Sequence, residues 1–291
     1  MRIGIYTSGG KYLSKEELTE LIELCNKENI LYSFNYEYSD YANRNFGYIL
    51  PAYHNAKNIP ADTDFMLSYG GDGTFLHCIA MLESRQIPII GINSGRLGFL
   101  ASVRKNGLEQ AIKCLLEHNY TLEKRSMLRV RGDFKEPLIS SDAFNEFTLQ
   151  KNGLNMINVE LHINGEYVAN YMADGLIIST PSGSTAYSMS VGGPIISPSC
   201  DCFIINPIAP HNLTMRPLIV NSTSQLSLSV TTRNKNCIAT LDNRAYTVDN
   251  KARFTIGLSS NNISMVKLPD SSFFDTLRQK LMWGTDITNS K

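Results

Sequence analysis

The chain has 291 residues, of which 43% are hydrophobic, and its 27 Lys and Arg residues balance its 27 Asp and Glu residues. This length is enough for two ordinary domains, each with a substantial core. Because the charges balance and no dense basic run occurs, the chain lacks the general electrostatic footprint of a protein that binds nucleic acid or an anionic membrane.

The N-terminal sequence and the cysteines indicate a cytoplasmic protein. The first ten residues contain an apolar stretch too short for a signal peptide, and no apolar run in the sequence is long enough to span a bilayer. The six cysteines follow no regular framework, so we expect reduced thiols that serve as small buried hydrophobic groups. The one close pair, Cys200 and Cys202, lacks the second pair or histidine that a metal site requires.

The first part of the chain alternates between two patterns. Short apolar runs at 2–6, 64–69 and 87–93 are each followed by an amphipathic helical pattern, at 14–29, 74–86 and 107–119. This alternation is typical of a parallel α/β sheet. The polar stretch 40–60 contains Pro51 and ends at Pro60, so we expect a loop or a short irregular helix there rather than a core element.

From about residue 126 the helical periodicity gives way to the alternation of β-strands. Asn164 and Gly165 separate two alternating runs and predict a hairpin turn, and the tail becomes helical again. We therefore predict an α/β N-terminal domain with a parallel, Rossmann-like sheet, a mostly β C-terminal domain, and a tail helix that packs back on the first domain. The predicted domains are 1–125 together with the tail 270–291, and 126–269.

The stretch "SYGGDGT", residues 68–74, is a glycine-rich turn between a strand and a helix. Gly70, Gly71 and Gly73 permit close backbone approach, and with Thr74 near the helix N-terminus they predict a phosphate-binding turn. Asp72 lies inside the turn and admits three interpretations. Its carboxylate can accept a hydrogen bond from a substrate hydroxyl, help hold a metal ion that bridges phosphates, or close the turn by bonding its own backbone.

A second stretch, "NSGRLGFL" at 93–100, follows the next apolar run. This position is the carboxyl end of a parallel strand, where ligands of open α/β sheets bind. Arg96 can meet a phosphate and Phe99 can cover a base or ribose. Alternatively, Arg96 is a solvated side chain and Phe99 an ordinary core aromatic.

Two further stretches of the β-rich half carry polar groups suited to a nucleotide. At 173–198 a strand that opens at Asp174 is followed by the turn "PSGST" and a short helix, which offer hydroxyl and N–H groups to a sugar or phosphate, although Ser182, Ser184 and Thr185 could be simple caps. In "DAFNEFTL" the adjacent Asn145 and Glu146 can read an adenine edge and accept from ribose hydroxyls, or form a polar loop.

Several familiar catalytic motifs are absent from the sequence. It contains no Gly-x-x-x-x-Gly-Lys-Ser/Thr phosphate loop, no His-Glu-x-x-His zinc helix and no Gly-x-Ser-x-Gly nucleophile elbow. Ser94 and Ser184 have no visible histidine partner, so the sequence does not favour nucleophilic catalysis.

Taken together and in order, the motifs resemble the NAD kinase family, which transfers a phosphoryl group to the 2′-hydroxyl of the adenosine ribose of NAD. The resemblance covers nearly the whole chain through "GGDGT", "NSGRLGFL", "RSML", "NE", "DGLIISTPSGSTAYSMSVGGPI", "HNLTMRPLIV" and the tail. It implies that Asp72 is catalytic, as a base or a metal-linked acceptor, and that 126–269 is the NAD-binding domain. The substrate-binding residues that it implies are Gly73, Phe99, Asn145, Glu146, Asp174, Thr185, Ala186, Tyr187 and Ser190.

The resemblance also implies partners. It suggests ATP or polyphosphate as the phosphoryl donor, a divalent metal such as Mg²⁺ with no ligands assigned, and a homodimer or homotetramer. The alternatives are a lipid or sugar kinase that shares the glycine turn, and a sensor that binds NAD or NADP without turnover. Where many members of the family have Asp-Gly-Gln, this chain has Asp242, Asn243 and Arg244, so the usual contacts of that loop do not carry over. Donor preference, the choice between NAD and NADH, and regulation stay open.

Overall fold

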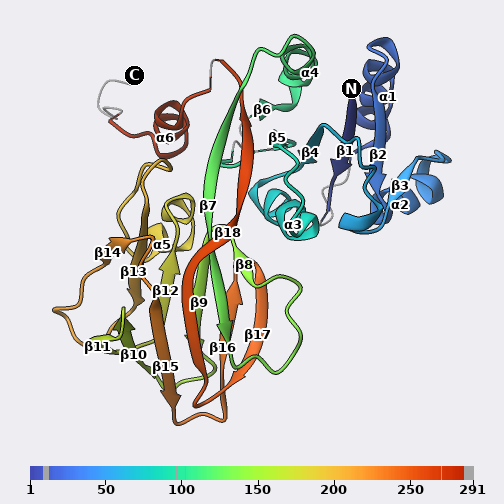
Figure 1. Cartoon of the computed structure of the whole chain (residues 1–291). Helices are drawn as coiled ribbons and strands as arrows, with labels where there is room; N and C mark the ends of the chain where they lie inside the picture. The colour runs from blue at the N-terminus through green and yellow to red at the C-terminus, as the bar shows by residue number, and fades with distance from the viewer. Residues whose placement is uncertain (9–12, 96–97, 102, 270, 285–291) are drawn as a thin grey trace, which may run out of the picture. The chain divides into compact units, whose positions relative to one another are not determined.

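A computed structural model describes residues 1–8, 13–95, 98–101, 103–269 and 271–284. The chain divides into two compact units, Met1–Lys124 together with Ile263–Lys291 (unit 1), and Arg125–Asn262 (unit 2). Figure 1 colours the chain from its N-terminus to its C-terminus. Each unit is described by itself.

Unit 1 is built on a parallel sheet. Its strands lie in the order β5-β4-β1-β2-β3, with β6 beside β5, and Met265 near the end of β18 also pairs with β5, at Ile89. The parallel register, for example Ile3 opposite Phe65, confirms the predicted α/β class. The strands of unit 1 are β1 (Arg2–Tyr6), β2 (Leu31–Asn35), β3 (Ala52–Tyr53), β4 (Phe65–Tyr69), β5 (Ile89–Asn93) and β6 (Val103–Arg104).

Amphipathic helices pack against this sheet around a core that includes Ile5, Leu18, Leu67 and Ile112. Helix α1 begins with a capping box between Ser14 and Glu17, which satisfies two backbone N–H groups of the helix start. The helices of unit 1 are α1 (Lys15–Lys27), α2 (Tyr36–Phe46), α3 (Asp72–Leu82), α4 (Leu108–Leu116) and α6 (Phe273–Leu281), with short 3₁₀ turns η1 (Ala56–Asn58) and η2 (Lys105–Gly107). The predicted tail helix is thus present as α6 and belongs to the same unit as the N-terminal domain.

Helix α2 corrects the prediction of a loop or short irregular helix at 40–60. The regular helix Tyr36–Phe46 extends into that stretch and ends at Gly47, whose φ is 76°. Its polar sequence hides a core element, because Tyr38 and Ala42 are fully buried and the Tyr38 hydroxyl donates to the Leu13 carbonyl. Tertiary packing decides the conformation here.

Unit 2 is almost entirely antiparallel β-structure. One sheet has the order β14-β13-β12-β9-β16-β17, and a second contains β11-β10-β15-β18, with β7 beside β18 and β8. The antiparallel strands β9, β12 and β13 run side by side in Figure 1. Its elements are β7 (Thr121–Gly132), β8 (Asp142–Ala143), β9 (Glu146–Lys151), β10 (Ile157–Ile163), β11 (Glu166–Ala173), β12 (Gly175–Ser179), η3 (Ser182–Thr185), α5 (Tyr187–Ser190), β13 (Cys202–Ile208), β14 (Leu218–Asn221), β15 (Leu226–Thr232), β16 (Asn236–Leu241), β17 (Arg244–Asp249) and β18 (Arg253–Lys267).

Both sheets of unit 2 contribute to one core, in which Phe147 and Phe203 from the first sheet join Leu161 and Phe254 from the second. The predicted hairpin turn is confirmed: Asn164 and Gly165 connect β10 to β11 with φ values of 52° and 86°. Beyond the predicted alternation, residues 253–267 form one continuous strand of 15 residues.

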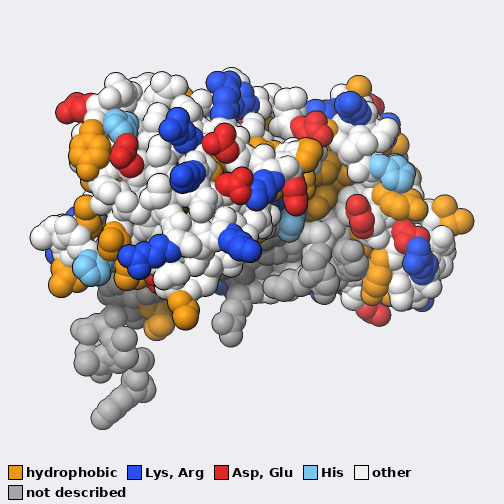
Figure 2. All heavy atoms as spheres, turned by 90° about the horizontal axis from the view of Figure 1, so that it is seen from below, with side chains coloured by type: hydrophobic (Ala, Val, Ile, Leu, Met, Phe, Trp, Pro, Cys, Tyr) orange, Lys and Arg blue, Asp and Glu red, His pale blue; other side chains and the backbone are white. Residues whose placement is uncertain are grey.

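The described surface agrees with the composition. On the face drawn in Figure 2, Lys and Arg side chains are interspersed with Asp and Glu side chains. Within the described ranges, no helix has both the length and the apolar character needed to cross a membrane. All six cysteines are free, and five of them are buried, Cys200 being exposed.

Candidate functional site

The glycine-rich turn connects β4 to the start of α3. Gly70 has a φ of 154°, and a β-carbon there would come within 2.3 Å of Thr74 Oγ1, so the turn requires glycine. Gly71 is the N-cap of α3 and offers no side chain to the first-turn N–H groups, which lack acceptors inside a helix. Because added β-carbons at Gly71 and Gly73 would meet nothing within 4 Å, the backbone here is open to an approaching anion.

Asp72 anchors a loop that follows the neighbouring strand. Its Oδ2 accepts from the N–H of Phe99 at 2.9 Å, and its Oδ1 accepts from Leu100 at 3.0 Å and Ala101 at 3.1 Å. Lys280 Nζ lies 3.7 Å from Oδ2. The carboxylate therefore bonds the backbone of a different turn, an arrangement that none of the three sequence-based interpretations anticipated.

The loop after β5 is held from its other side by Asn93. The buried Asn93 side chain accepts from the N–H of Gly95 at 2.7 Å and donates to the Ala101 carbonyl at 3.3 Å. Phe99 is half-buried, with Lys280 Nζ 4.6 Å from its ring centroid. Arg96 lies outside the described residues. Beside this loop is a cavity of about 610 Å³, lined by Glu20, Asn93, Ser94, Gly95, Arg104, Lys105 and Asn106.

In unit 2, Asp242 has the same relation to Asn145 and Glu146 that Asp72 has to its loop. Its carboxylate accepts from the N–H groups of Phe144 at 2.9 Å, Asn145 at 2.7 Å and Glu146 at 3.2 Å. The Asp242 N–H in turn donates to the Glu146 carbonyl at 2.9 Å. The tip of the β16–β17 hairpin thus fixes the backbone of the predicted adenine- and ribose-binding pair.

Arg244, at the start of β17, has structural partners. Its guanidinium donates to the carbonyls of Leu241 at 3.1 Å, Ser140 at 3.1 Å and Asp142 at 2.6 Å, and lies 3.6 Å from the Asp242 carboxylate. The role of this loop, which the sequence left open, is therefore to join the hairpin tip to the segment that leads into Asn145.

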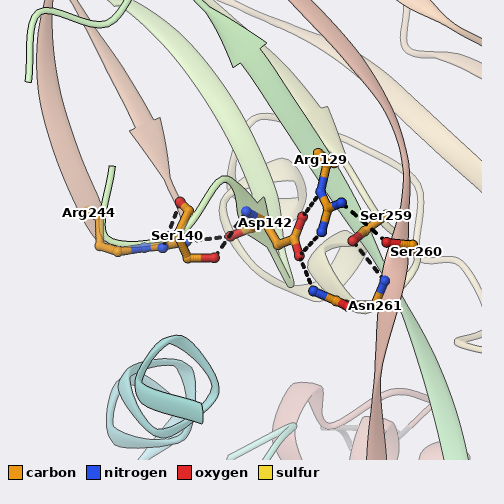
Figure 3. A network of polar contacts seen from close by, with 7 residues as sticks. All are labelled: Arg129, Ser140, Asp142, Arg244, Ser259, Ser260 and Asn261. Carbon is orange, nitrogen blue, oxygen red and sulfur yellow. Dashed lines mark hydrogen bonds and ion pairs between the residues drawn. The ribbon is translucent and has the colours of Figure 1, made fainter. Parts of the chain in front are cut away.

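A polar network holds the same segment from its other side (Figure 3). Arg129 binds the Asp142 carboxylate through two bonds, of 2.7 and 2.8 Å, and also donates to Ser260 at 3.2 Å. Asn261 donates to the second oxygen of Asp142 at 2.9 Å. Residues 140–142 are thereby tied to β7, β17 and β18, which gives Asn145 and Glu146 a rigid base.

Asn145 and Glu146 carry buried polar atoms with no hydrogen-bond partner among the described residues. These atoms are Asn145 Oδ1 and Glu146 Oε2. Burial and, to a smaller extent, the nearby Asp242 carboxylate together raise the pKa of Glu146 to about 8, against the opposing effect of the Tyr187 N–H. Burial also raises the pKa of Asp242, against its three amide donors and Arg244. A buried polar atom without a hydrogen-bond partner lowers the stability of the fold. Two such atoms on adjacent residues are therefore typical of a site whose partners come from a bound ligand.

The polar residues of the stretch 174–190 differ in their partners and in their exposure. The hydroxyls of Ser182, Ser184 and Thr185 bond within the protein, to Arg125, to the backbone of Ile196 and to the Ser182 carbonyl. These bonds tie the turn to itself, to Arg125 and to the Ile196 backbone, and none of them caps η3 or α5. Ala186 and Tyr187 are half-buried, and Ser190 is exposed.

Gly183 and Asp174 lie at opposite ends of strand β12. A β-carbon at Gly183 would come within 2.2 Å of the Asn145 carbonyl oxygen, so this glycine lets the turn approach the predicted pair. In the strand register, Ser179 lies opposite Glu146 and Gly175 opposite Gln150. Asp174, ion-paired to Lys151 at 2.7 Å, is thus separated from Glu146 by the length of β12.

No metal cage is formed in the described part of the chain, where no three His, Cys, Asp or Glu side chains gather closely enough to hold an ion. Sequence reasoning also missed Lys280 and the anchoring role of Arg244. Their partners are distant in the sequence, and no local motif marks either residue.

Comparison with known proteins identifies related proteins over nearly the whole chain. Residues 13–120 match the family described as ATP-NAD kinase N-terminal domain, and residues 144–268 match the ATP-NAD kinase C-terminal domain. The chain is 38% identical to an NAD kinase of Christiangramia forsetii over 294 aligned positions, covering 99% of this chain and 100% of that protein. It is 44% identical to an NAD kinase of Flavobacterium psychrophilum over 236 positions, 80% of each chain.

Solved structures share the fold. A yeast NADH kinase complexed with NADH matches with a TM-score of 0.88 at 22% identity, covering 100% of this chain and 90% of that one. An Archaeoglobus fulgidus NAD kinase in complex with ATP matches with a TM-score of 0.74 at 25% identity, covering 97% and 99%.

Proposed function

The chain belongs to the NAD kinase family, and on that premise we propose how its residues carry out the reaction. Its activity is that of an NAD kinase, which transfers the terminal phosphoryl group of ATP to the 2′-hydroxyl of the adenosine ribose of NAD and so makes NADP. The geometric observation that carries the proposal is Asp72 at the open N-terminus of α3, within a turn whose glycines leave the backbone accessible.

Unit 1 is proposed to receive the phosphoryl donor. A helix N-terminus with free N–H groups attracts phosphate through directed hydrogen bonds and the helix dipole. The N-cap Gly71 and the accessible backbone at Gly73 support this assignment. Gly70, Gly71, Gly73 and Thr74 then form the phosphate-binding turn, with Phe99 close to the nucleotide.

Unit 2 is proposed to bind NAD. The unpartnered Oδ1 of Asn145 is suited to the exocyclic amine of adenine, and Glu146 is suited to a ribose. With a pKa of about 8, Glu146 holds its proton at neutral pH and can donate a hydrogen bond as well as accept one. Asp174, Thr185, Ala186, Tyr187 and Ser190 are proposed to line the remainder of the dinucleotide site.

Asp72 is proposed to orient the ribose hydroxyl and to accept its proton late in the reaction. Phosphoryl transfer through a loose transition state depends on alignment and charge neutralisation more than on a strong base. Both oxygens of Asp72 already accept amide hydrogen bonds, so a hydroxyl would share an oxygen with these donors. Since acceptance from N–H groups stabilises the charged carboxylate, proton transfer belongs to the stage at which the new P–O bond is forming.

A divalent ion such as Mg²⁺ is proposed to enter with ATP. Because no cluster of three ligating side chains exists among the described residues, the donor set fits an ion carried mainly by the triphosphate, with Asp72 as the nearby carboxylate. When bound, such an ion neutralises negative charge on the phosphate oxygens.

Assembly and location are further parts of the proposal. We propose a homodimer or homotetramer, supported by the exposed Tyr167, Val168 and Met172 on the edge strand β11. Light scattering of the purified chain tests this.

A cytoplasmic location, in keeping with the NAD and ATP substrates, is tested by cell fractionation.

The function is tested by incubating the purified chain with NAD, ATP and Mg²⁺ and measuring NADP. NAD that lacks the 2′-hydroxyl on its adenosine ribose is the matched control and must not react. Parallel reactions with polyphosphate and with NADH decide the donor and acceptor preferences. NADP binding without ATP-dependent NADP formation would identify a sensor instead, and phosphorylation of a lipid or sugar but not NAD would identify a different kinase.

A further inference from the structure

The tail helix α6 places a cation beside the phosphate-binding turn. Lys280 Nζ lies 3.7 Å from Asp72 Oδ2 and 4.6 Å from the centroid of the Phe99 ring. The two charged side chains are 27% and 32% exposed, so both remain accessible to a ligand. The cation–π contact between the ammonium and the Phe99 ring favours this position of the Lys280 side chain.

The pair with Asp72 does not use the full bonding capacity of Lys280. Asp72 already accepts three amide hydrogen bonds, and a partly exposed ion pair at 3.7 Å is a loose one. An ammonium group has three N–H donors, so it can bind a second anion while it faces the carboxylate.

The position of Lys280 also removes an electrostatic conflict within the turn. Asp72 puts a negative charge in the first turn of α3, where it would repel the phosphates that the helix N-terminus attracts. The ammonium of Lys280 neutralises that charge at short range. An incoming anion therefore meets a locally balanced site with a cation at its edge.

We propose that Lys280 binds the terminal phosphate of the donor nucleotide and bridges it to Asp72. The proposal rests on the NAD kinase function, because it assigns a phosphate contact within that reaction. Lys280 lies on a helix far from the glycine turn in sequence and supplies the cation that a lysine inside the motif provides in other phosphate loops.

Binding measurements on the full-length chain test the proposal. In calorimetric titrations with ATP, ADP and AMP, Lys280→Met should weaken ATP binding at least about tenfold and AMP binding less than about twofold. Lys280→Arg keeps the charge and should bind ATP within about threefold of the original chain. Inorganic tripolyphosphate, tested as a competitor of ATP, should lose affinity in Lys280→Met to a similar degree.

Arg278→Met is the matched control. Arg278 occupies the same last turn of α6 and pairs with Asp275, so its removal costs the helix a comparable interaction with its dipole. This variant should bind all three nucleotides as the original chain does. Equal weakening of ATP and AMP in Lys280→Met, or equal losses in the two Met variants, would show a merely structural role and overturn the proposal.

The binding readout separates this proposal from the function on which it rests. If the original chain binds ATP in a Lys280-dependent way but forms no NADP, the phosphate contact stands and the kinase assignment fails. If it forms NADP and Lys280→Met retains both ATP affinity and turnover within about threefold, the kinase assignment stands and the Lys280 proposal fails.

Discussion

Gly98 lies so close to Asp72 that a β-carbon on it would fall 1.8 Å from the carboxylate Oδ1. The absence of a side chain at Gly98 is what allows the next three residues to present their N–H groups to one carboxylate. The stretch 93–100 and Asp72 of the stretch 68–74 therefore form one hydrogen-bonded structure. Its disruption can be tested without changing the charge of Asp72.

Gly98→Ala should displace the 98–101 loop from Asp72 and destabilise the chain by about 1–2 kcal/mol, because the half-buried Asp72 carboxylate loses amide donors. Urea denaturation followed by circular dichroism measures this. Gly107→Ala is the control, since an added β-carbon there would make only an ordinary contact of 3.5 Å with Val103. Equal stability of the two variants would show that Asp72 does not depend on the close approach of Gly98.

Asp72→Asn keeps the size of the side chain and removes its charge. Turnover of NAD should fall at least about tenfold, equivalent to ~1.4 kcal/mol of activation free energy, if Asp72 orients the hydroxyl and receives its proton. Steady-state kinetics well below the unfolding temperature measure the loss. Because Gly98→Ala disturbs the same loop but retains the carboxylate, it shows how much of the loss comes from the loop. A reduction of less than tenfold would contradict the catalytic role.

Glu146 should make stability depend on pH in an unusual direction. Its pKa of about 8 lies above the ordinary value of 4.5, so between these values the folded state binds more protons than the unfolded state. The free energy of unfolding therefore falls as pH rises through this window, by at most ~1.4 kcal/mol per pH unit for one group.

Glu146→Gln removes that contribution, so the variant should gain stability relative to the original chain between pH 5 and pH 8, most of it toward the upper end. Denaturation curves at several pH values give the comparison. Glu166→Gln, at an exposed position of β11, is the control for the loss of a carboxylate from the same unit. Parallel stability curves for Glu146→Gln and the original chain would exclude the raised pKa.

Arg244→Met should destabilise the chain by about 3–5 kcal/mol, because three backbone carbonyls lose their guanidinium donors and the buried Asp242 carboxylate loses its neighbouring cation. The Michaelis constant for NAD should rise, since Asn145 and Glu146 lose part of their support. Denaturant titration and kinetics give the two values. Arg233→Met, at an exposed position of the same unit, is the control. A change below about 1 kcal/mol would show that the carbonyls find other donors.

Much of the fold follows from local pattern. The alternation of apolar runs and amphipathic helices predicted the parallel sheet of unit 1, and the asparagine-glycine pair predicted the β10–β11 hairpin. Helix α2 was missed because its composition is polar overall, although burial of Tyr38 and Ala42 on one face stabilises it. The alternation did not predict that β18 is one continuous strand, since its pairing partners β15 and β5 are distant in the chain.

The sequence by itself determined which chemical groups are present: a glycine turn with one acid at a helix start, an adjacent Asn145–Glu146 pair, and the family to which the motifs belong. Those signals are local, because turn conformation and helix starts depend on neighbouring residues. Only the tertiary structure decided the partners of these groups. Asp72 receives the amides of residues 99–101 and the ammonium of Lys280, while Asp242 and Arg244 hold the backbone around Asn145. Hydrogen bonds and ion pairs between distant segments form only when the fold brings those segments together, so no spacing in the sequence encodes them.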